Sequence, residues 1–173
     1  MITRLTGSEF DAALDDLTVI LHTCVHDGAS IGFILPFTQE DARYYWQQNV
    51  RPGVNAGALE IFAAYDGPRV VGTAQLIPAA MPNQPHRADV AKLLVHPNAR
   101  RRGYGRALME TLFQRARDLH RSTLVLDTRS TDPSRLLYES LGFQIVGEIP
   151  KYCQNPFEPR LEPTTYMYKD LSA

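Results

Sequence analysis

One stretch near the middle of the chain constrains the fold more than any other. An apolar run over residues 90–95 ends at His96-Pro97, a basic turn with Gly103 and Gly105 follows, and a long amphipathic helix is predicted after Gly105. The apolar stripe of that helix comprises Leu108, Met109, Leu112, Phe113, Ala116 and Leu119. A buried strand, a short turn and an amphipathic helix in this order predict an α/β sandwich.

The basic turn is typical of a site for a phosphate group. The first turn of a helix has N–H groups without partners and carries the positive end of the helix dipole. Gly103 and Gly105 let the backbone approach an anion closely, and Arg100–Arg102 and Arg106 add positive charge. No Gly-Lys-Ser/Thr follows, which excludes a Walker loop, and a dinucleotide fingerprint would need a third glycine. A solvated basic turn that caps the helix is the plain alternative.

The rest of the chain alternates between helix and strand signals. We expect strands at residues 2–6, 59–65, 69–77, 86–95, 122–128, 143–149 and 165–168. Helices are expected at 9–25 with Ser8 as N-cap, from Thr38 to a point before Pro52-Gly53, after Gly105, and from Asp132 to Gly142. This order predicts a single α/β domain over residues 1–173 with a mixed sheet.

Composition narrows the class of protein. The chain has 173 residues, 44% of them apolar, which is enough for one domain with a sizeable core. A net charge of −1 gives no overall attraction to nucleic acid or acidic membranes. The N-terminal segment lacks a signal-peptide pattern, and no window approaches the roughly 20 apolar residues of a membrane span, so a soluble cytoplasmic chain is expected. Cys24 and Cys153 are expected to be free thiols, and no metal site is expected.

Two motifs resemble those of a known family. Arg100-x-x-Gly103-x-Gly105, after a strand that ends Leu93-Leu94-Val95-His96-Pro97, resembles the acetyl-CoA signature of the GNAT acetyltransferases. Leu137-Tyr138-Glu139-Ser140-Leu141-Gly142-Phe143 resembles a second GNAT motif. The stretches at 28–33, 87–93, 126–128 and 147–153 are similar to the tabtoxin-resistance type of GNAT enzyme. The resemblance implies an α/β (α+β) fold with a mixed, mostly antiparallel sheet of about six or seven strands flanked by about four helices.

The resemblance also implies a cofactor, acetyl-CoA, and the residues that bind it. The backbone of Leu93, Leu94 and Val95 would pair with the pantetheine arm. The pyrophosphate would be held by the backbone N–H groups of Arg101, Arg102, Gly103, Tyr104, Gly105 and Arg106, next to Arg100. Many family members have an asparagine at the position of Thr131, so Thr131 or Ser134 would replace that contact.

The implied reaction is a direct attack of a neutral amine on the thioester. A carboxylate or a water chain should take the proton from the amine, and Asp89 and Asp127 are the candidates. Alternation would put Asp89 on the same side of its strand as Ala91, Leu93 and Val95. Alternatively, Asp89 is a solvated residue at the start of its strand, without a role in catalysis. The alternative role for Asp127 is to cap the turn at residues 128–130. A backbone N–H of the 86–95 strand would polarise the thioester oxygen.

Tyr138 is implied to protonate the leaving thiolate; a packed helix residue is its alternative reading. Of the three aromatic residues Tyr44, Tyr45 and Trp46, one should reach a surface or a pocket, because three in a row cannot share one helix face. The 28–33 loop would shape the acceptor site, with Tyr152 and the 154–163 loop forming its other wall.

The expected function is N-acetylation of a small-molecule amine, such as an amino-acid-like toxin or antibiotic. Three alternatives stay open: a protein or peptide N-acetyltransferase, a non-catalytic acyl-CoA-binding domain, and a nucleic-acid-binding protein, for which no aromatic stacking platform is present. We expect no nucleic-acid partner and no membrane partner. A homodimer is possible.

Overall fold

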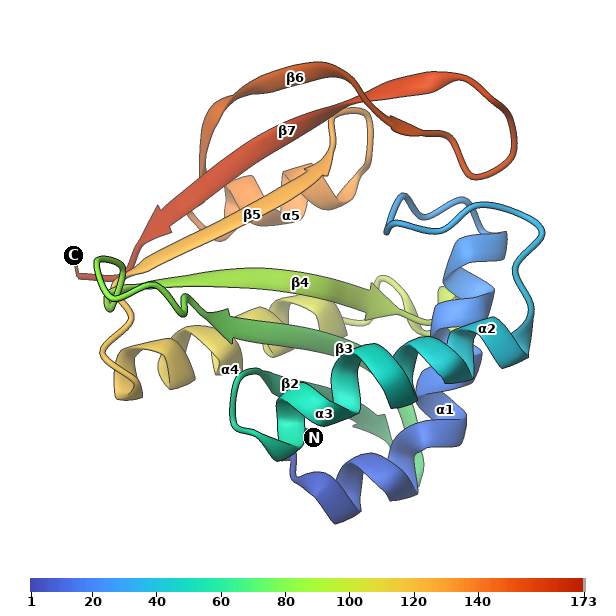
Figure 1. Cartoon of the computed structure of the whole chain (residues 1–173), viewed down its shortest axis with the longest axis horizontal. Coiled ribbons are helices and arrows are strands. Elements are labelled where there is room, and N and C mark those ends of the chain that lie inside the picture. The colour runs from blue at the N-terminus through green and yellow to red at the C-terminus, as the bar shows by residue number, and fades with distance from the viewer. Residues whose placement is uncertain (173) are drawn as a thin grey trace.

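A seven-stranded mixed sheet runs through the molecule in the order β1-β2-β3-β4-β5-β7-β6 (Figure 1). The computed structural model describes residues 1–172. The strands are β1 (Ile2–Leu5), β2 (Glu60–Asp66), β3 (Arg69–Pro78), β4 (Arg87–Val95), β5 (Thr123–Arg129), β6 (Gln144–Gln154) and β7 (Leu161–Asp170). Among the strand pairs of residues 1–172, only β4–β5 is parallel. The predicted mixed, mostly antiparallel sheet is therefore confirmed.

Four helical stretches cover the two faces of the sheet, as predicted. They are α1 (Gly7–His26), the continuous stretch α2 (Gln39–Tyr44), η1 (Tyr45–Val50) and α3 (Arg51–Asn55), then α4 (Tyr104–Asp118), and α5 (Ser134–Ser140). A single 3-10 turn, η2 (Pro97–Ala99), precedes α4. One apolar core lies between the sheet and α1–α3, and a second lies between the sheet and α4 with α5. We call these two sides the α1 face and the α4 face.

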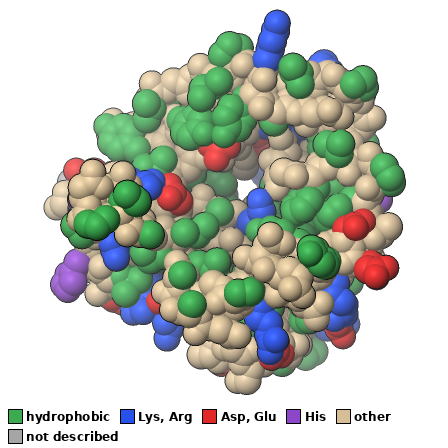
Figure 2. All heavy atoms as spheres, in the orientation of Figure 1, with side chains coloured by type: hydrophobic (Ala, Val, Ile, Leu, Met, Phe, Trp, Pro, Cys, Tyr) green, Lys and Arg blue, Asp and Glu red, His purple; other side chains and the backbone are tan. Residues whose placement is uncertain are grey.

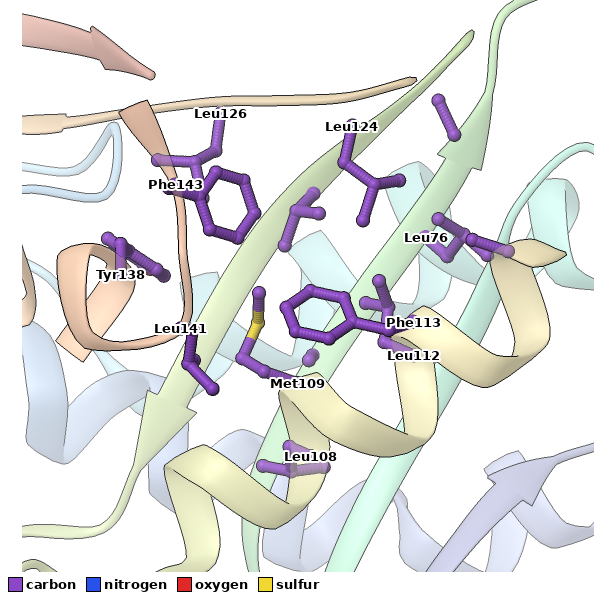
Figure 3. Packing of buried hydrophobic residues seen from close by; sticks show 14 of the residues in the cluster. Leu76, Leu108, Met109, Leu112, Phe113, Leu124, Leu126, Tyr138, Leu141 and Phe143 are labelled. Carbon is purple, nitrogen blue, oxygen red and sulfur yellow. The ribbon is translucent and has the colours of Figure 1, made fainter. Parts of the chain in front are cut away.

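The predicted stripe of α4 forms the centre of the second core (Figure 3). Leu108, Met109 and Leu112 are completely buried and belong to one cluster with Leu76 of β3 and Leu124 of β5. Burying a side chain of this size contributes about 1.5–3 kcal/mol. The α4 helix is thus held on both sides of the β4–β5 junction, which positions its N-terminus.

Several predicted boundaries were wrong. Thr6, not Ser8, is the N-cap of α1, because Glu9 accepts hydrogen bonds from Thr6 and completes a capping box. The second helix continues past Pro52, since Pro52 lies in the first turn of α3 after the wider π-helical turn η1, where no N–H is needed. Strands β6 and β7 are longer than expected; β6 tolerates Pro150 because it is an edge strand.

The sheet splits between β4 and β5. These strands pair only at Arg87–Thr123, Ala88–Leu124 and Asp89–Val125, whereas β5 stays paired with β7 over its full length. Beyond Asp89 the two strands diverge, as Figure 1 shows. The remaining part of β4, residues 90–95, therefore has one edge without a strand partner.

A bulge interrupts β4 beside this gap. Gln75 pairs with Ala91 and Thr73 pairs with Leu94, so two β4 residues, Lys92 and Leu93, lie opposite one β3 residue. Lys92 has a positive φ of 50°. The extra residue moves Leu93 to the α4 face, where it packs on that core. The expectation that Asp89, Ala91, Leu93 and Val95 share one side was wrong for this reason.

No helix in residues 1–172 has the length and apolar character to cross a membrane. Within the same residues, His, Cys, Asp and Glu side chains form no group of three that could bind a metal ion. Cys24 and Cys153 are both free.

Candidate active site

The basic turn ends in an exposed helix N-terminus. Gly103 is the N-cap of α4 and has a φ of 86°, and Arg101 has a φ of 62°. Ala107 donates the first intrahelical hydrogen bond, to the Gly103 carbonyl at 3.0 Å. The N–H groups of residues 104–106 therefore have no carbonyl partner within the helix and are available to an anion. Gly105 packs on α5, where an added Cβ would lie 3.3 Å from Leu137.

The arginines of the turn bind neighbouring protein groups. Arg102 forms an ion pair with Asp66 at 2.7 Å and lies over the ring of Tyr104. Arg106 donates to Ser140 at 2.8 Å, and Arg100 bridges Asp27 and the carbonyl of Val95. These contacts hold the turn in shape and leave its backbone N–H groups exposed. Arg101 is exposed.

The gap between β4 and β5 opens on both faces of the sheet, and the N-terminus of α4 follows the strand that borders it. Leu94 and Val95 pair with β3 on one side, and their other edge borders the gap. In the space-filling view the surface is hollowed near its centre, where the β4 and β5 sides separate (Figure 2). A separate depression of about 390 Å³ lies at the β1 side of the molecule. It is lined by Arg4, Leu5, Thr6, Gly7, Val54, Asn55, Gly57, Leu59 and Glu60, none of them a predicted site residue.

Tyr138 approaches the gap from the α4 face. It is 7% exposed and packs edge-on against Phe143 at 5.8 Å between ring centroids. Burial raises the pKa of Tyr138 well above its ordinary value, and the nearby Asp132 and Asp127 carboxylates add to this. The hydroxyl is therefore protonated throughout the physiological range and can act only as a proton donor or hydrogen-bond partner.

Asp127 approaches the gap from the α1 face, opposite to Tyr138. Its neighbours Leu124 and Leu126 point to the α4 core, which puts Asp127 on the other side of β5. Asp127 is exposed to solvent there, but surrounding protein atoms still desolvate it and raise its pKa, while Lys92 lowers it. Tyr166 is its cross-strand partner on β7, and a hydrogen bond with Tyr152 raises the pKa of Tyr166 to about 12.

Asp89 lies at the closed end of the gap. It is paired with Val125 in the sheet and forms an ion pair with Arg87 at 2.6 Å. Its charge is close enough to raise the pKa of Asp127. The structure thus brings both predicted carboxylates to one face, with Asp127 nearer to the open end.

The two polar residues proposed to replace the family's asparagine differ in their surroundings. Ser134 shares a hydrogen bond with Thr128 at 2.9 Å, and its backbone N–H donates to Asp132 at 2.8 Å. Asp132 therefore caps the start of α5. Thr131 is exposed in the loop before it.

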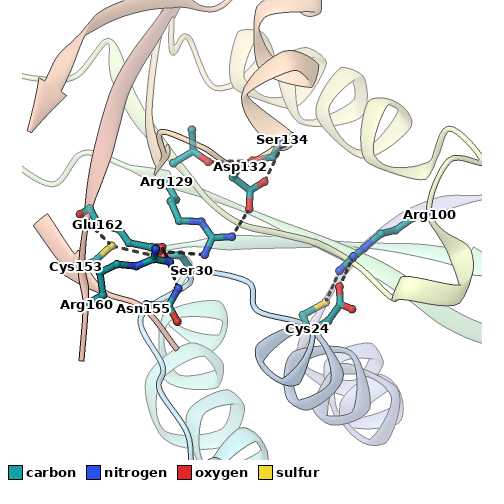
Figure 4. Close-up of polar contacts among 12 residues, drawn as sticks. Cys24, Ser30, Arg100, Arg129, Asp132, Ser134, Cys153, Asn155, Arg160 and Glu162 are labelled. Atoms are coloured by element: carbon teal, nitrogen blue, oxygen red, sulfur yellow. Dashed lines mark hydrogen bonds and ion pairs between the residues drawn. The ribbon is translucent and has the colours of Figure 1, made fainter. Parts of the chain in front are cut away.

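Two loops meet on the α1 face and bridge the gap. The backbone N–H of Leu35, in the α1–α2 loop, donates to the Pro156 carbonyl in the β6–β7 loop at 2.9 Å. The hydroxyl oxygen of Ser30 and the sulfur of Cys153 are 3.3 Å apart (Figure 4). The ring of Phe157 packs on Gly28. The first loop belongs to the β1–β4 half and the second to the β5–β7 half. Their contact closes one side of the gap.

An ionic network around the buried Glu162 joins the β6–β7 loop to β5 (Figure 4). Glu162 is 8% exposed and accepts hydrogen bonds from Asn155 at 2.9 Å, Arg160 at 3.1 Å and Arg129 at 3.2 Å. Arg129 also forms an ion pair with Asp132, which joins this loop to the start of α5.

Three residues at this site were not predicted from the sequence: Lys92, Gln75 and Tyr166. Lys92 donates to the Ile31 carbonyl at 2.8 Å and lies over the rings of Phe33 and Tyr45. A lysine inside the otherwise apolar run from Val90 to Val95 was the available signal. Trp46 is buried and Tyr44 is exposed, which confirms that one aromatic of the three reaches a surface or a pocket. Tyr45 faces Lys92.

Known proteins share both the sequence pattern and this architecture. The model of the acetyltransferase (GNAT) family matches residues 14–143. Human N-acetyltransferase 8 is 35% identical over 82 residues, which are 46% of this chain and 36% of the human protein, so the match spans about a third of that relative.

Two solved structures resemble nearly the whole chain. A ribosomal-protein-alanine N-acetyltransferase from Brucella melitensis has a TM-score of 0.78 at 23% identity, with 98% of this chain and 99% of that chain covered. A phosphinothricin acetyltransferase from Sinorhizobium meliloti, in complex with acetyl-CoA, has a TM-score of 0.79 at 20% identity, with 98% and 87% covered. These structural similarities establish a common fold. The family match over residues 14–143 shows that the chain belongs to the GNAT family of acetyltransferases.

Proposed function

We propose that the chain, acting as one domain, transfers the acetyl group of acetyl-CoA directly to the primary amine of a small molecule, with amino-acid-like toxins or antibiotics as the class to test first. The observation that carries this proposal is the loop contact between Leu35 and Pro156. It closes the acceptor side of the gap, which favours a small acceptor over an extended peptide in an open groove. The resemblance to the tabtoxin-resistance type and the fold shared with a phosphinothricin acetyltransferase support the same choice.

The residues around the gap fit acetyl-CoA. The unpaired N–H groups at the start of α4 suit a pyrophosphate, and the free edge of β4 at residues 93–95 suits the amides of a pantetheine arm. Arg100 and Arg102 serve to hold this turn in shape through Asp27 and Asp66. We assign the contacts of the basic turn with the cofactor chiefly to its backbone. We assign the contact from the loop before α5 to Thr131 and Ser134.

The two faces of the gap divide the chemistry. The amine nitrogen, on the α1 face, forms a bond to the acetyl carbonyl carbon and loses a proton to Asp127, directly or through water, with Asp89 as the second carboxylate. A backbone N–H at the β4 bulge polarises the carbonyl oxygen. Breaking the carbon–sulfur bond of a bound thioester would leave a thiolate, and Tyr138, on the α4 face, would give it a proton. Asp127 thus lies on the face where a proton would be removed, and Tyr138 lies on the face where a proton would be given.

The test is turnover by the purified chain. Acetyl-CoA and a panel of amines are mixed, and release of free CoA thiol is measured; the panel includes phosphinothricin, free amino acids and a peptide with an N-terminal alanine. Acetylation of small amines with little activity on the peptide supports the proposal. Preference for the peptide would instead favour the protein-acetylating alternative. Tight acetyl-CoA binding without turnover of any amine would favour a non-catalytic binding domain.

A further inference from the structure

Lys92 lies on the acceptor side of the β4 bulge and has no role in the proton transfers described above. Its ammonium has three N–H donors, and the Ile31 carbonyl takes one of them at 2.8 Å. The rings of Phe33 and Tyr45 lie 5.7 and 5.6 Å away and provide a cation–π surface. Within residues 1–172, no carboxylate is at ion-pair distance from this ammonium. Two charged donors are therefore available to a ligand.

A second unsatisfied donor lies on the neighbouring strand. Gln75 of β3 is 2% exposed, and its Nε2 has no hydrogen-bond partner in the described part of the chain. Gln75 is the cross-strand partner of Ala91, the residue before Lys92, and both point to the α1 face. Its side chain also contacts the hydroxyl of Tyr45: burial raises the pKa of Tyr45, and this contact with Gln75 opposes that effect. The ring of Tyr45 faces Lys92. A buried amide donor without a partner costs stability unless a ligand or water satisfies it.

These donors lie opposite a negative charge. Asp127, across the gap on β5, is near enough that its charge and that of Lys92 affect each other's pKa. One side of the gap thus presents N–H donors, and the other presents a carboxylate. A ligand that satisfies both sides has an anionic oxygen group and an amine in the same small molecule.

We propose that Lys92 and Gln75 form an oxyanion subsite of the acceptor pocket, which binds a carboxylate of the acceptor while Asp127 binds the amine to be acetylated. The inference rests on the proposed acetyl transfer and names its acceptor class: amines with a carboxylate a few bonds from the nitrogen. The aromatic rings of Phe33 and Tyr45 exclude water from the subsite, which strengthens charged hydrogen bonds there.

The test compares matched acceptors that differ only in the carboxylate. Binding of L-lysine and cadaverine, L-histidine and histamine, and L-tyrosine and tyramine to the chain saturated with CoA is measured by titration calorimetry. The wild-type chain should bind the acid of a fitting pair roughly 10- to 100-fold more tightly than the amine, as expected for a charge-assisted hydrogen bond. Lys92→Met should abolish this preference and leave the affinity for CoA unchanged, while the affinity for the amine stays the same or rises, because a positive charge near Asp127 is removed.

Two further variants separate recognition from folding. Lys169→Met is the matched control, because Lys169 also lies over an aromatic ring, that of Phe113, but on the α4 face; it should keep the preference. Gln75→Met removes a donor without a partner, so it should fold with an unchanged or higher melting temperature and reduce the preference. A structural role for Gln75 would instead lower the melting temperature.

The outcomes distinguish this inference from the proposed function. Equal loss of acid and amine binding in Lys92→Met, or no preference in the wild-type chain, overturns the subsite. CoA release is followed with the same pairs. Selective binding without any CoA release supports the subsite and overturns acetyl transfer, whereas CoA release without selectivity does the reverse.

Discussion

Arg100 donates from its guanidinium to Asp27 at the end of α1 and from its Nε to the Val95 carbonyl at the end of β4, the latter at 3.2 Å. The same side chain therefore joins α1, β4 and the basic turn. The thiol of Cys24 lies beside this guanidinium, and burial raises the pKa of that thiol, so it is a neutral packing group here. Arg100, which begins the motif that resembles the acetyl-CoA signature, thus has a structural role in this chain: it links α1 to the end of β4.

Removing the ion pair between Arg100 and Asp27 should weaken CoA binding, although neither side chain is assigned a contact with the cofactor. Asp27→Asn leaves every proposed cofactor contact in place but frees the Arg100 side chain. Because the pair is about half exposed, we expect a loss of up to about fivefold in CoA affinity, equivalent to about 1 kcal/mol. Titration calorimetry with CoA measures it. An affinity equal to that of the wild-type chain would mean that the turn keeps its shape without the ion pair.

Gly103 should matter more to CoA binding than any single arginine. Its φ of 86° is unfavourable for a side chain by roughly 1–2 kcal/mol, so Gly103→Ala should distort the turn that presents the N–H groups. Gly67, in the β2–β3 turn, has a φ of 59° and open space around it. Gly67→Ala should lower the melting temperature similarly without affecting CoA affinity. If Arg101→Ala harms CoA binding more than Gly103→Ala, the side chains and not the backbone hold the pyrophosphate.

Tyr138→Phe should reduce turnover and spare cofactor binding. The change removes one hydroxyl from a buried, well-packed ring, and loss of a general acid typically costs about 10²–10⁴-fold in rate. Burial raises the pKa of Tyr138, so the wild-type acid stays protonated as pH rises through the ordinary tyrosine range. The rate of the wild-type chain should therefore show no loss from tyrosine ionisation near pH 10. Unchanged turnover in Tyr138→Phe would leave this residue a packing role only.

The pH profile should report Asp127. A base must be ionised, and desolvation raises the pKa of Asp127, so its contribution to kcat/KM should be lost, as pH falls, at a higher pH than for an ordinary aspartate. Lys92 lowers this pKa, so Lys92→Met should shift the loss further upward. Asp127→Asn should remove it and leave only the ionisation of the amine. The same result in Asp89→Asn, with Asp127→Asn unaffected, would identify Asp89 as the base.

Glu162 should couple stability to pH. Hydrogen bonds from Asn155 and the Arg129 guanidinium lower the pKa of Glu162, so the folded state favours the ionised form. Its contribution is complete above the ordinary pKa of 4.5 and is lost as pH falls through the lowered folded value. Glu162→Gln should cost on the order of 1–3 kcal/mol at neutral pH. Glu158→Gln, at an exposed ion pair, is the control and should change the melting temperature little. Equal effects would show that the network is not stabilising.

Local patterns predicted much of the cofactor half of the site. The α4 stripe and Gly142 after α5 depend on residues close together in sequence, and the structure has them where the sequence indicated. The predicted start of α4 after Gly105 was wrong, because Gly103 is the N-cap and the helix begins at Tyr104. The family resemblance added the mixed, mostly antiparallel character of the sheet, which no local pattern contains.

The acceptor half depended on tertiary structure. The sequence by itself determined the basic turn, the apolar stripe of α4 and the family. It did not show that β4 has one more residue than β3 between two pairings. This extra residue moves Leu93 to the α4 face and leaves Lys92 beside Tyr45. A bulge depends on the register of the partner strand, and register is set by packing between residues far apart in sequence. For the same reason only the folded chain shows Gln75 next to Ala91, Tyr166 opposite Asp127, and two distant loops joined at Leu35 and Pro156.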